Sequence, residues 1–263
     1  MNEGENFLKN RCLCYNEAVF KPWARPLLNG LMNILYPPVC FLCQRSLFPA
    51  ESGQCVCPSC LASIEMNSPP FCSKCSRPLK KPARAFCHNC QRSNFHFDNV
   101  YAACRYSEPF QRLLHLYKYG NLTAIRKIFA SRMIEFIDTH QIPVKDYQLI
   151  LAVPLHPVRQ RERGYNQSEL LAAELAGHYR IPFRNNILKR TLYSPNQARV
   201  SPKQRWTNVE SAFKIGSHSC ITNTNILLVD DLITTGATLS SLSGVLKAGG
   251  AKKVSALTAA IAE

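Results

Sequence analysis

Short apolar segments of the kind that form buried parallel strands occur twice in the second half of the chain. Residues 149–153 and 226–229 are continuously apolar, as expected of central strands that are covered on both faces. Residues 100–106 alternate in character and predict an earlier strand, and residues 254–261 predict a final one. Between the strands, apolar residues recur at helical spacing in four segments: 108–119, 122–140, 168–179 and 237–248. Strands that alternate with helices predict an α/β domain with a parallel sheet.

Residues 40–90 have a different pattern, with Pro, Ser, Arg and Gln where a core would need apolar residues. Four C-x-x-C pairs lie here, and each pair can offer two thiolates to one tetrahedral ion. They predict two structural four-cysteine zinc sites, with the ligands paired in chain order: Cys40, Cys43, Cys57 and Cys60; then Cys72, Cys75, Cys87 and Cys90. The spacers inside the two sites are thirteen and eleven residues long. A single pair can also be redox-active, but four pairs so close together favour metal.

Three alternatives remain open within this segment. The pairs can also combine in a cross-braced order. Cys55 can replace Cys57 as a ligand, since both precede the same Cys60. His88 lies inside the last pair, where we expect an exposed bystander and not a ligand. In every arrangement an all-cysteine shell leaves no open position for chemistry, so we expect the metal to supply folding energy.

The composition restricts the partners and the compartment. The chain has 263 residues and a formal net charge of +15, from 32 Lys and Arg against 17 Asp and Glu. Nucleic acid and phosphorylated ligands are therefore both expected partners. No apolar run approaches the roughly 18 residues of a membrane helix, and the first ten residues lack the apolar core of a signal peptide. We predict a cytoplasmic protein that is not an integral membrane protein, in which thirteen cysteines indicate metal and not disulfides.

Three segments follow from these patterns. Residues 1–36 show no clear periodicity and are predicted to be an N-terminal extension. Residues 37–96 are predicted to form a double zinc-finger segment. Residues 97–263 are predicted to form the sheet domain.

The stretch 225–238 joins a buried strand to a turn of small residues and then to a helix. Asp230 and Asp231 follow the apolar run, at the carboxyl end of a strand, where open α/β sheets bind ligands. The turn lies at the positive end of the helix dipole, which favours an anion. Its residues are Thr234, Thr235, Gly236, Ala237 and Thr238. Two carboxylates beside a phosphate cradle suit a sugar phosphate, although two Asp before a helix can also serve only as caps.

Two basic segments are further candidates for phosphate binding. Arg159, Arg161 and Arg163 follow the strand at 149–153, and arginine binds phosphate through two parallel N–H donors. The alternative for this segment is a solvated basic loop. Lys118 lies in the last turn of the helix at 108–119, where it either contacts phosphate or only complements the helix dipole.

These motifs together resemble the ComF family over residues 37–262. The resemblance rests on the cysteine pairs and on six further matches: Lys118-Tyr119, Val153-Pro154-Leu155, the Arg-Gly-Tyr-Asn-Gln run at 163–167, Gln197, Arg205-x-x-Asn208 and the stretch 225–238. That last stretch resembles the phosphoribosyl pyrophosphate (PRPP) motif of type I phosphoribosyltransferases. Tyr165 stands where phenylalanine is common, and Cys55 is an extra cysteine.

The resemblance implies a zinc-binding segment on a type I phosphoribosyltransferase fold. It places Asp230 and Asp231 on the ribose hydroxyls of PRPP, residues 234–238 around the 5′-phosphate, and Mg²⁺ with the ligand. It also implies uptake and handling of single-stranded DNA in natural transformation, with a helicase of the competence machinery as a candidate partner.

Two functional hypotheses remain. In one, the protein is an active Mg²⁺-dependent phosphoribosyltransferase with an unidentified nucleobase or nucleotide-related acceptor, and Arg159, Arg161 or Arg163 holds the pyrophosphate. In the other, the phosphate cradle is kept to grip single-stranded DNA, and aromatic residues of the zinc segment stack on bases. The candidates for stacking are Phe71, Phe86, Phe95 and Phe97. The PRPP motif favours the first and the charge favours the second. We predict DNA handling, with catalysis left open.

Overall fold

The computed structural model describes residues 38–47, 55–80, 85–191, 212–216 and 221–262. They form two compact units, one of Met1–Ile64 with Ser107–Ile125 and the other of Glu65–Tyr106 with Arg126–Glu263. The predicted N-terminal extension lies outside the described residues, as do Gln197, Arg205 and Asn208. None of the helices in the described ranges combines the length and the hydropathy that a membrane crossing requires.

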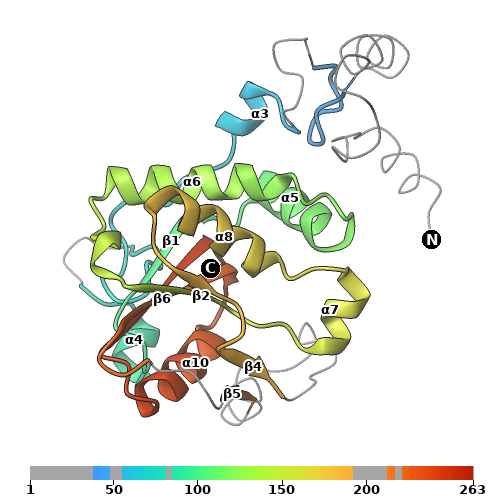
Figure 1. The fold of residues 1–263 in the computed structure, drawn as a ribbon. Coiled ribbons are helices and arrows are strands. Elements are labelled where there is room, and N and C mark those ends of the chain that lie inside the picture. Colours follow the sequence, from blue (N-terminus) through green and yellow to red (C-terminus); the bar gives the residue numbers. More distant parts are fainter. Residues whose placement is uncertain (1–37, 48–54, 81–84, 192–211, 217–220, 263) are drawn as a thin grey trace. The chain divides into compact units, whose positions relative to one another are not determined.

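The second unit is built on a five-stranded sheet with strand order β1-β7-β6-β2-β3 (Figure 1). All four pairings are parallel. The strands are β1 (Val100–Arg105), β2 (Leu149–Ala152), β3 (Phe183–Arg184), β6 (Asn225–Ile233) and β7 (Lys253–Ile261). Residues 226–229 of β6 are all buried, because the strand has a neighbour on each side and is covered on both faces. The predicted α/β class with a parallel sheet is confirmed.

Helices cover both faces of this sheet. Figure 1 shows α6 (Ile125–Thr139) and α8 (Gln167–Tyr179) on one face and α10 (Ala237–Ala248) on the other, together with the short α4 (His88–Arg92). Arg126 of α6 pairs with Glu174 of α8 at 2.8 Å. Leu239, Leu242 and Leu246 of α10 are buried, one or two turns apart on a single face, as their spacing in the sequence predicted.

Four smaller elements complete the described part of this unit. They are the 3₁₀ turn η2 (Val144–Asp146), the helix α7 (Pro157–Arg163) and an antiparallel pair of β4 (Leu188–Arg190) and β5 (Phe213–Ile215). The segment that carries Arg159, Arg161 and Arg163 is therefore helical, and the alternative of a basic loop is wrong. Pro157 starts the helix and Gly164, at φ 80°, ends it.

The first unit contains two described helices, α3 (Pro58–Ala62) and α5 (Glu108–Tyr119). The bounds of α5 match the predicted helix, and its buried face consists of Phe110, Leu113, Leu114 and Tyr117. Pro109 in its first turn has no N–H that the helix would need to satisfy.

The strand order places a topological switch between β2 and β6. From β2 the chain passes through α8 to β3 on one side, and from β6 it passes through α10 to β7 on the other. Connections that leave adjacent strands in opposite directions open a crevice at the carboxyl ends of those strands. The segments after β2 and after β6, both predicted to bind phosphate, follow the carboxyl ends of these two strands.

Candidate functional site

The eight predicted metal ligands form two groups of four. Cys40, Cys43, Cys57 and Cys60 make one group; Cys72, Cys75, Cys87 and Cys90 make the other. Within each group all sulfur atoms lie within 4.8 Å of one another. The cysteines thus pair in chain order and not in a cross-braced order, and Cys55 belongs to neither group.

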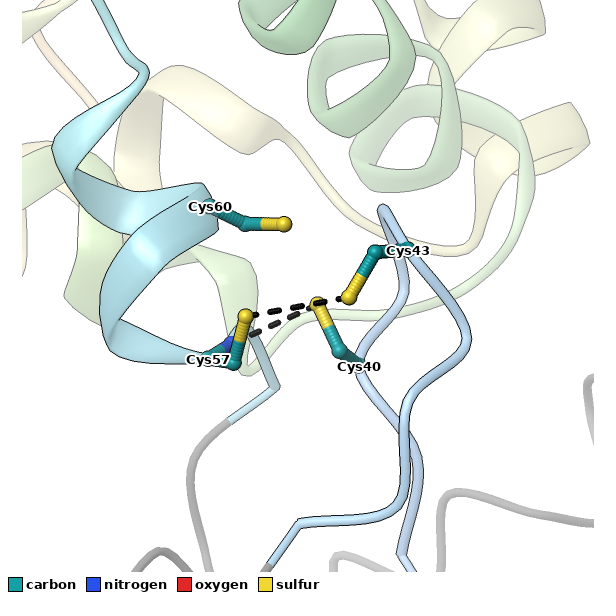
Figure 2. Close-up of side chains that lie close together, drawn as sticks. All are labelled: Cys40, Cys43, Cys57 and Cys60. Atoms are coloured by element: carbon teal, nitrogen blue, oxygen red, sulfur yellow. Dashed lines mark hydrogen bonds between the residues drawn. The ribbon is translucent and has the colours of Figure 1, made fainter.

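The geometry of both groups fits zinc. Sulfurs at about 2.3 Å from a tetrahedral ion lie roughly 3.8 Å from one another. The Sγ atoms of Cys43 and Cys57 are 3.7 Å apart, and the backbone N–H of Cys57 donates to Cys40 Sγ at 3.3 Å (Figure 2). In the second group the Sγ atoms of Cys75 and Cys87 are 3.5 Å apart. Four thiolates close the coordination shell, so both sites are structural.

The thiols of each group ionise unequally. A hydrogen bond from Ser59 lowers the pKa of Cys57 to about 5, while burial raises the pKa of Cys60. In the second group a hydrogen bond with Cys75 lowers the pKa of Cys72 to about 4, and burial raises the pKa of Cys90 to about 12. Because the ion must displace the protons of the high-pKa thiols, zinc binding releases protons and weakens as pH falls.

The second group is part of the hydrophobic core of the sheet. We call residues 38–64 ribbon one and residues 70–92 ribbon two. Cys72, Cys75 and Cys87 of ribbon two are 1%, 5% and 6% exposed and belong to the buried cluster that contains Val100, Leu228 and Leu242. The metal ligands of ribbon two therefore contribute to the packing under α10.

The two aspartates of the PRPP-like stretch lie inside β6, because the strand continues past them to Ile233. Consecutive residues of a strand point to opposite faces. The Oδ1 atom of Asp230 accepts hydrogen bonds from the Ser168 hydroxyl at 2.8 Å and from the Asp231 N–H at 2.9 Å. Asp230 is half-buried, whereas only 4% of Asp231 is exposed. The carboxylate of Asp230 is thus more accessible to solvent or a ligand than that of Asp231.

Residues 234–238, which we call the phosphate loop, turn sharply from β6 into α10. Gly236 precedes the helix at φ 84°, a left-handed conformation that favours glycine. The Thr235 hydroxyl accepts the N–H of Ala237 at 3.4 Å, and Thr234 is exposed. The loop therefore presents hydroxyl groups and the N-terminus of a 12-residue helix at the switch point, a combination suited to an anion.

The three arginines of α7 do not share one face. At 3.6 residues per turn, Arg163 lies about 40° from Arg159 around the helix axis, and Arg161 lies about 160° away. Arg161 is exposed, while Arg159 and Arg163 are partly buried. Arg159 also pairs with Glu162 at 3.1 Å. Only Arg159 and Arg163 can approach one ligand together.

Sequence reasoning missed the role of Asn166 and Ser168. Asn166 caps α8, where its Oδ1 accepts the Ser168 N–H at 3.0 Å and its Nδ2 donates to the carbonyl of Val153 at 3.1 Å. Ser168 then holds Asp230. A buried polar chain thus links the end of β2 to β6 across the switch point. The signal was present in the sequence, since Asn166 and Glu169 have the spacing of a capping box.

The remaining predicted contact residues, a lysine and several phenylalanines, differ in what the structure shows of them. Lys118 lies in the last turn of α5, in the first unit, and its contact with phosphate stays a prediction. Phe95 and Phe97 are 6% and 1% exposed and stack on each other with 4.7 Å between ring centroids, so their proposed stacking on bases is wrong. Phe86, at 45% exposed, is available for such contact.

Several known proteins are similar to this chain in sequence. Residues 31–91 match the family model of the double zinc ribbon domain. Competence protein F of Haemophilus influenzae is 32% identical over 220 residues, which cover 82% of this chain and 93% of that protein. The DNA utilization protein YhgH of Escherichia coli (strain K12) is 25% identical, with coverage of 83% and 94%. Competence protein ComFC of Streptococcus pneumoniae is 29% identical, with coverage of 78% and 86%.

Among solved structures, a purine phosphoribosyltransferase from Pyrococcus horikoshii aligns with 49% of this chain and 71% of its own, at 18% identity and a TM-score of 0.33. That score is low, and the fold assignment rests on strand order and register. The family match and the cysteine geometry agree that the chain carries two structural zinc ribbons.

Proposed function

Because this chain belongs to the ComF family, we propose that it handles single-stranded DNA during DNA uptake, on a scaffold that binds PRPP or a similar sugar phosphate. The observation that carries the proposal is the 32% identity to Competence protein F across 93% of that protein. A similarity of this length includes the zinc ribbons and the sheet together. The names of the other relatives, a competence protein and a DNA utilization protein, support the same role.

The chemistry of the switch point supports a sugar phosphate as the small ligand. The phosphate loop offers hydroxyls and a helix N-terminus to the phosphate. Asp230 is the better placed aspartate for a sugar hydroxyl, because it is half-buried and oriented by Ser168, whereas Asp231 is almost fully buried. Carboxylate oxygens are also the ligands that Mg²⁺ prefers, and that ion would bind through one or two of them together with the phosphates of PRPP.

Charge supports DNA as the large ligand. A net charge of +15 gives an electrostatic attraction for polyanions that does not depend on sequence. We propose that Arg159 and Arg163 of α7 contact phosphates of the strand. Phe86 is the described aromatic residue of ribbon two with the exposure to stack on a base.

A second candidate function is phosphoribosyl transfer. The observation that favours it is the coupling of Asp230, through Ser168 and Asn166, to the end of the neighbouring strand. Groups held in place before the reaction are the main device by which enzymes stabilise developing charge.

The test is a fluorescence anisotropy titration of labelled single-stranded DNA, with and without Mg-PRPP. Mg-ATP at the same ionic strength controls for competition by charge alone. We expect DNA to bind and PRPP to displace it more effectively than ATP does. Binding that PRPP leaves unchanged would place DNA and sugar phosphate at separate sites. An absence of DNA binding at low salt would overturn the DNA role and leave transferase activity as the candidate.

A further inference from the structure

We propose that Arg77 of ribbon two is a positioning residue for the phosphate loop, through which the metal-bound ribbon sets the affinity of the loop for sugar phosphate. The inference rests on the proposed function for its ligand and on the described contacts for its mechanism. Arg77 is not a metal ligand, and it was not among the residues that the sequence singled out.

The guanidinium of Arg77 holds the ends of two neighbouring strands. Its Nη2 donates to the carbonyl of Thr234 at 2.6 Å, and its Nη1 donates to the carbonyl of Ala262 at 3.1 Å. Thr234 is the first residue after β6 and Ala262 the first after β7. A planar guanidinium with two donors fixes the distance and the orientation of two carbonyls at once, which a lysine cannot do.

The backbone of Arg77 belongs to the turn around the Cys72-x-x-Cys75 pair; we call such a turn a zinc knuckle. Its carbonyl accepts the N–H of the ligand Cys72 at 2.8 Å. The neighbouring Ser76 donates its hydroxyl to the carbonyl of Val100 at 2.8 Å, and Asn67 donates to the carbonyl of Ser76 at 2.8 Å. The turn between Cys75 and Arg77 is thereby held by the metal ligands on one side and by β1 on the other.

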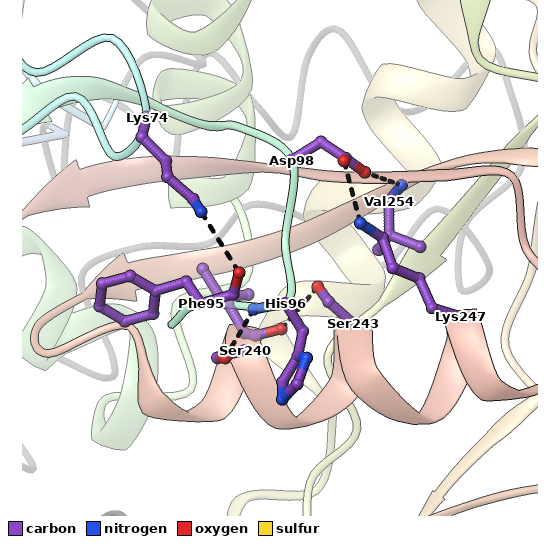
Figure 3. A network of polar contacts seen from close by, with 9 residues as sticks. Lys74, Phe95, His96, Asp98, Ser240, Ser243, Lys247 and Val254 are labelled. Atoms are coloured by element: carbon purple, nitrogen blue, oxygen red, sulfur yellow. Dashed lines mark hydrogen bonds and ion pairs between the residues drawn. The ribbon is translucent and has the colours of Figure 1, made fainter. Parts of the chain in front are cut away.

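The segment that follows ribbon two, residues 93–98, packs beside the phosphate loop and the start of α10. A Cβ atom on Gly236 would lie 3.2 Å from the ring of Phe95 and 3.5 Å from that of Phe97, so this aromatic pair lies directly beside the loop and leaves no room for a side chain there. The N–H of His96 donates to the Ser240 hydroxyl in the first turn of α10 at 3.1 Å, and Lys74 of the knuckle donates to the carbonyl of Phe95 at 3.3 Å (Figure 3).

Farther along α10, Asp98 adds a second attachment. Its carboxylate accepts from Lys247 at 2.9 Å and from the N–H of Val254, the second residue of β7, at 2.8 Å (Figure 3). Ribbon two and the segment that follows it therefore contact the loop, the helix after it and the strand after that helix.

These contacts set how much of the time the loop holds its binding conformation. When only a fraction of molecules has that conformation, the apparent affinity falls by the same fraction. Loss of the Arg77 bonds lowers this fraction without removing any group that touches the ligand. We expect roughly tenfold weaker PRPP binding, since one hydrogen bond to a charged group contributes about 1.5 kcal/mol or more.

The test compares Arg77→Gln and Arg77→Lys with Arg45→Gln. Arg45 is the counterpart of Arg77 in ribbon one, and its carbonyl accepts the N–H of Cys40 at 2.8 Å. Three measurements are made on each full-length variant: zinc per chain, affinity for Mg-PRPP by calorimetry, and hydrogen exchange of the amides at 234–240. Arg45→Gln removes the same charge from the same turn of the other ribbon.

We expect all variants to keep two zinc ions per chain. Arg77→Gln and Arg77→Lys should weaken PRPP binding about tenfold and speed exchange in the loop, while Arg45→Gln stays within about twofold of the unmodified protein. Wild-type affinity in Arg77→Lys would show that charge alone matters and would overturn the positioning role. Loss of zinc in Arg77→Gln would also overturn it, since Arg77 would then act on the knuckle and not on the loop.

The exchange measurement separates this inference from the proposed function. If the unmodified protein fails to bind PRPP, the proposed ligand is wrong, yet faster loop exchange in Arg77→Gln would still support the positioning role. If PRPP binds and Arg77→Gln changes neither affinity nor exchange, the ligand stands and the inference fails.

Discussion

The two zinc ribbons share one local structure and differ in what surrounds them. In each ribbon, four hydrogen bonds close the first knuckle at matching positions. Cys40, Phe41, Gln44 and Leu47 donate in ribbon one, and Cys72, Ser73, Ser76 and Leu79 donate in ribbon two, all at distances of 2.7 to 3.0 Å. Gln44 and Ser76 even share a positive φ, 60° and 58°. A C-x-x-C knuckle is thus specified by a few local residues.

The surroundings separate the ribbons. The second ligand of ribbon one, Cys43, is exposed, whereas its counterpart Cys75 is 5% exposed and lies in the core of the sheet. The ligands of ribbon two pack against residues that are far away in the sequence. In ribbon two, the metal motif therefore folds its own segment and also completes the core of a larger domain.

The largest expected effect comes from removing one buried ligand. Cys75→Ser should destabilise the sheet unit by about 4 kcal/mol or more, because it removes a metal from a packed core. Cys43→Ser should also lose one zinc ion but change the unfolding of the sheet by less than about 1 kcal/mol. Urea unfolding followed by circular dichroism, with zinc analysis, measures both. Equal losses would mean that the ribbons do not differ in the way that burial indicates.

The next effect concerns the ligand and leaves both ribbons intact. Asp230→Asn should weaken PRPP binding at least tenfold, since one lost hydrogen bond to a charged group contributes about 1.5 kcal/mol or more. The Asp230→Asn, Asp231→Asn pair should weaken it little further, because only 4% of Asp231 is exposed. Asp138→Asn, an exposed change of the same charge on α6, is the control. Calorimetry with Mg-PRPP provides the measurement. Unchanged affinity in the double variant would remove the assignment of the PRPP motif.

A smaller effect probes the contact between the phosphate loop and the segment after ribbon two. Gly236→Ala and Gly164→Ala both place a Cβ at positive φ, which costs about 1 kcal/mol or more. Only the first also meets a ring, because nothing lies within 4 Å of a Cβ at Gly164. Gly236→Ala should therefore lose about 1 kcal/mol more stability than Gly164→Ala in thermal unfolding. Equal losses in the two variants would show that Phe95 moves aside without cost.

The smallest expected effect is on the salt dependence of DNA binding, and it distinguishes a contact through α7 from a contact through the ribbons. Neutralising Arg159 and Arg163 together should reduce the slope of log affinity against log salt by about 1.4, at about 0.7 per phosphate on a single strand. Arg161→Gln should leave the slope unchanged, since Arg161 lies on the other side of the helix. Anisotropy titrations at several salt concentrations give both slopes. If only substitutions of basic residues in the ribbons changed the slope, the DNA-binding surface would lie on the ribbons and not on α7.

Acid should act on both ribbons in the same direction. Because burial raises the pKa of Cys90 to about 12, zinc binding must displace its proton, and that displacement becomes harder as pH falls. Zinc retention should therefore decline on acidification, and the sheet should lose stability in step with ribbon two. Zinc release measured with a chromophoric chelator, beside circular dichroism, follows the two events. Sheet unfolding that precedes zinc release would separate the core from the metal.

The sequence by itself determined several features that depend on neighbours along the chain. The apolar run at 226–229 identified a central strand, since a strand covered on both faces has no polar side. The spacing of the eight cysteines identified two four-thiolate sites, because two residues between ligands suit one tetrahedral ion. The small residues between the apolar run and the next helical pattern located the turn from β6 into α10, and binding of phosphate there stays a prediction.

Only the tertiary structure decided what depends on contacts between distant segments. It showed that Arg159, Arg161 and Arg163 lie on a helix and so do not form one clamp, and that Phe95 and Phe97 face a core and not a nucleic acid. It also brought Arg77 to Thr234, 157 residues later in the chain. No local pattern encodes such a bond, because an arginine in a knuckle has the same neighbours whether its side chain meets solvent or a strand end. Parallel strands with long crossovers bring such residues together only when the whole sheet has formed.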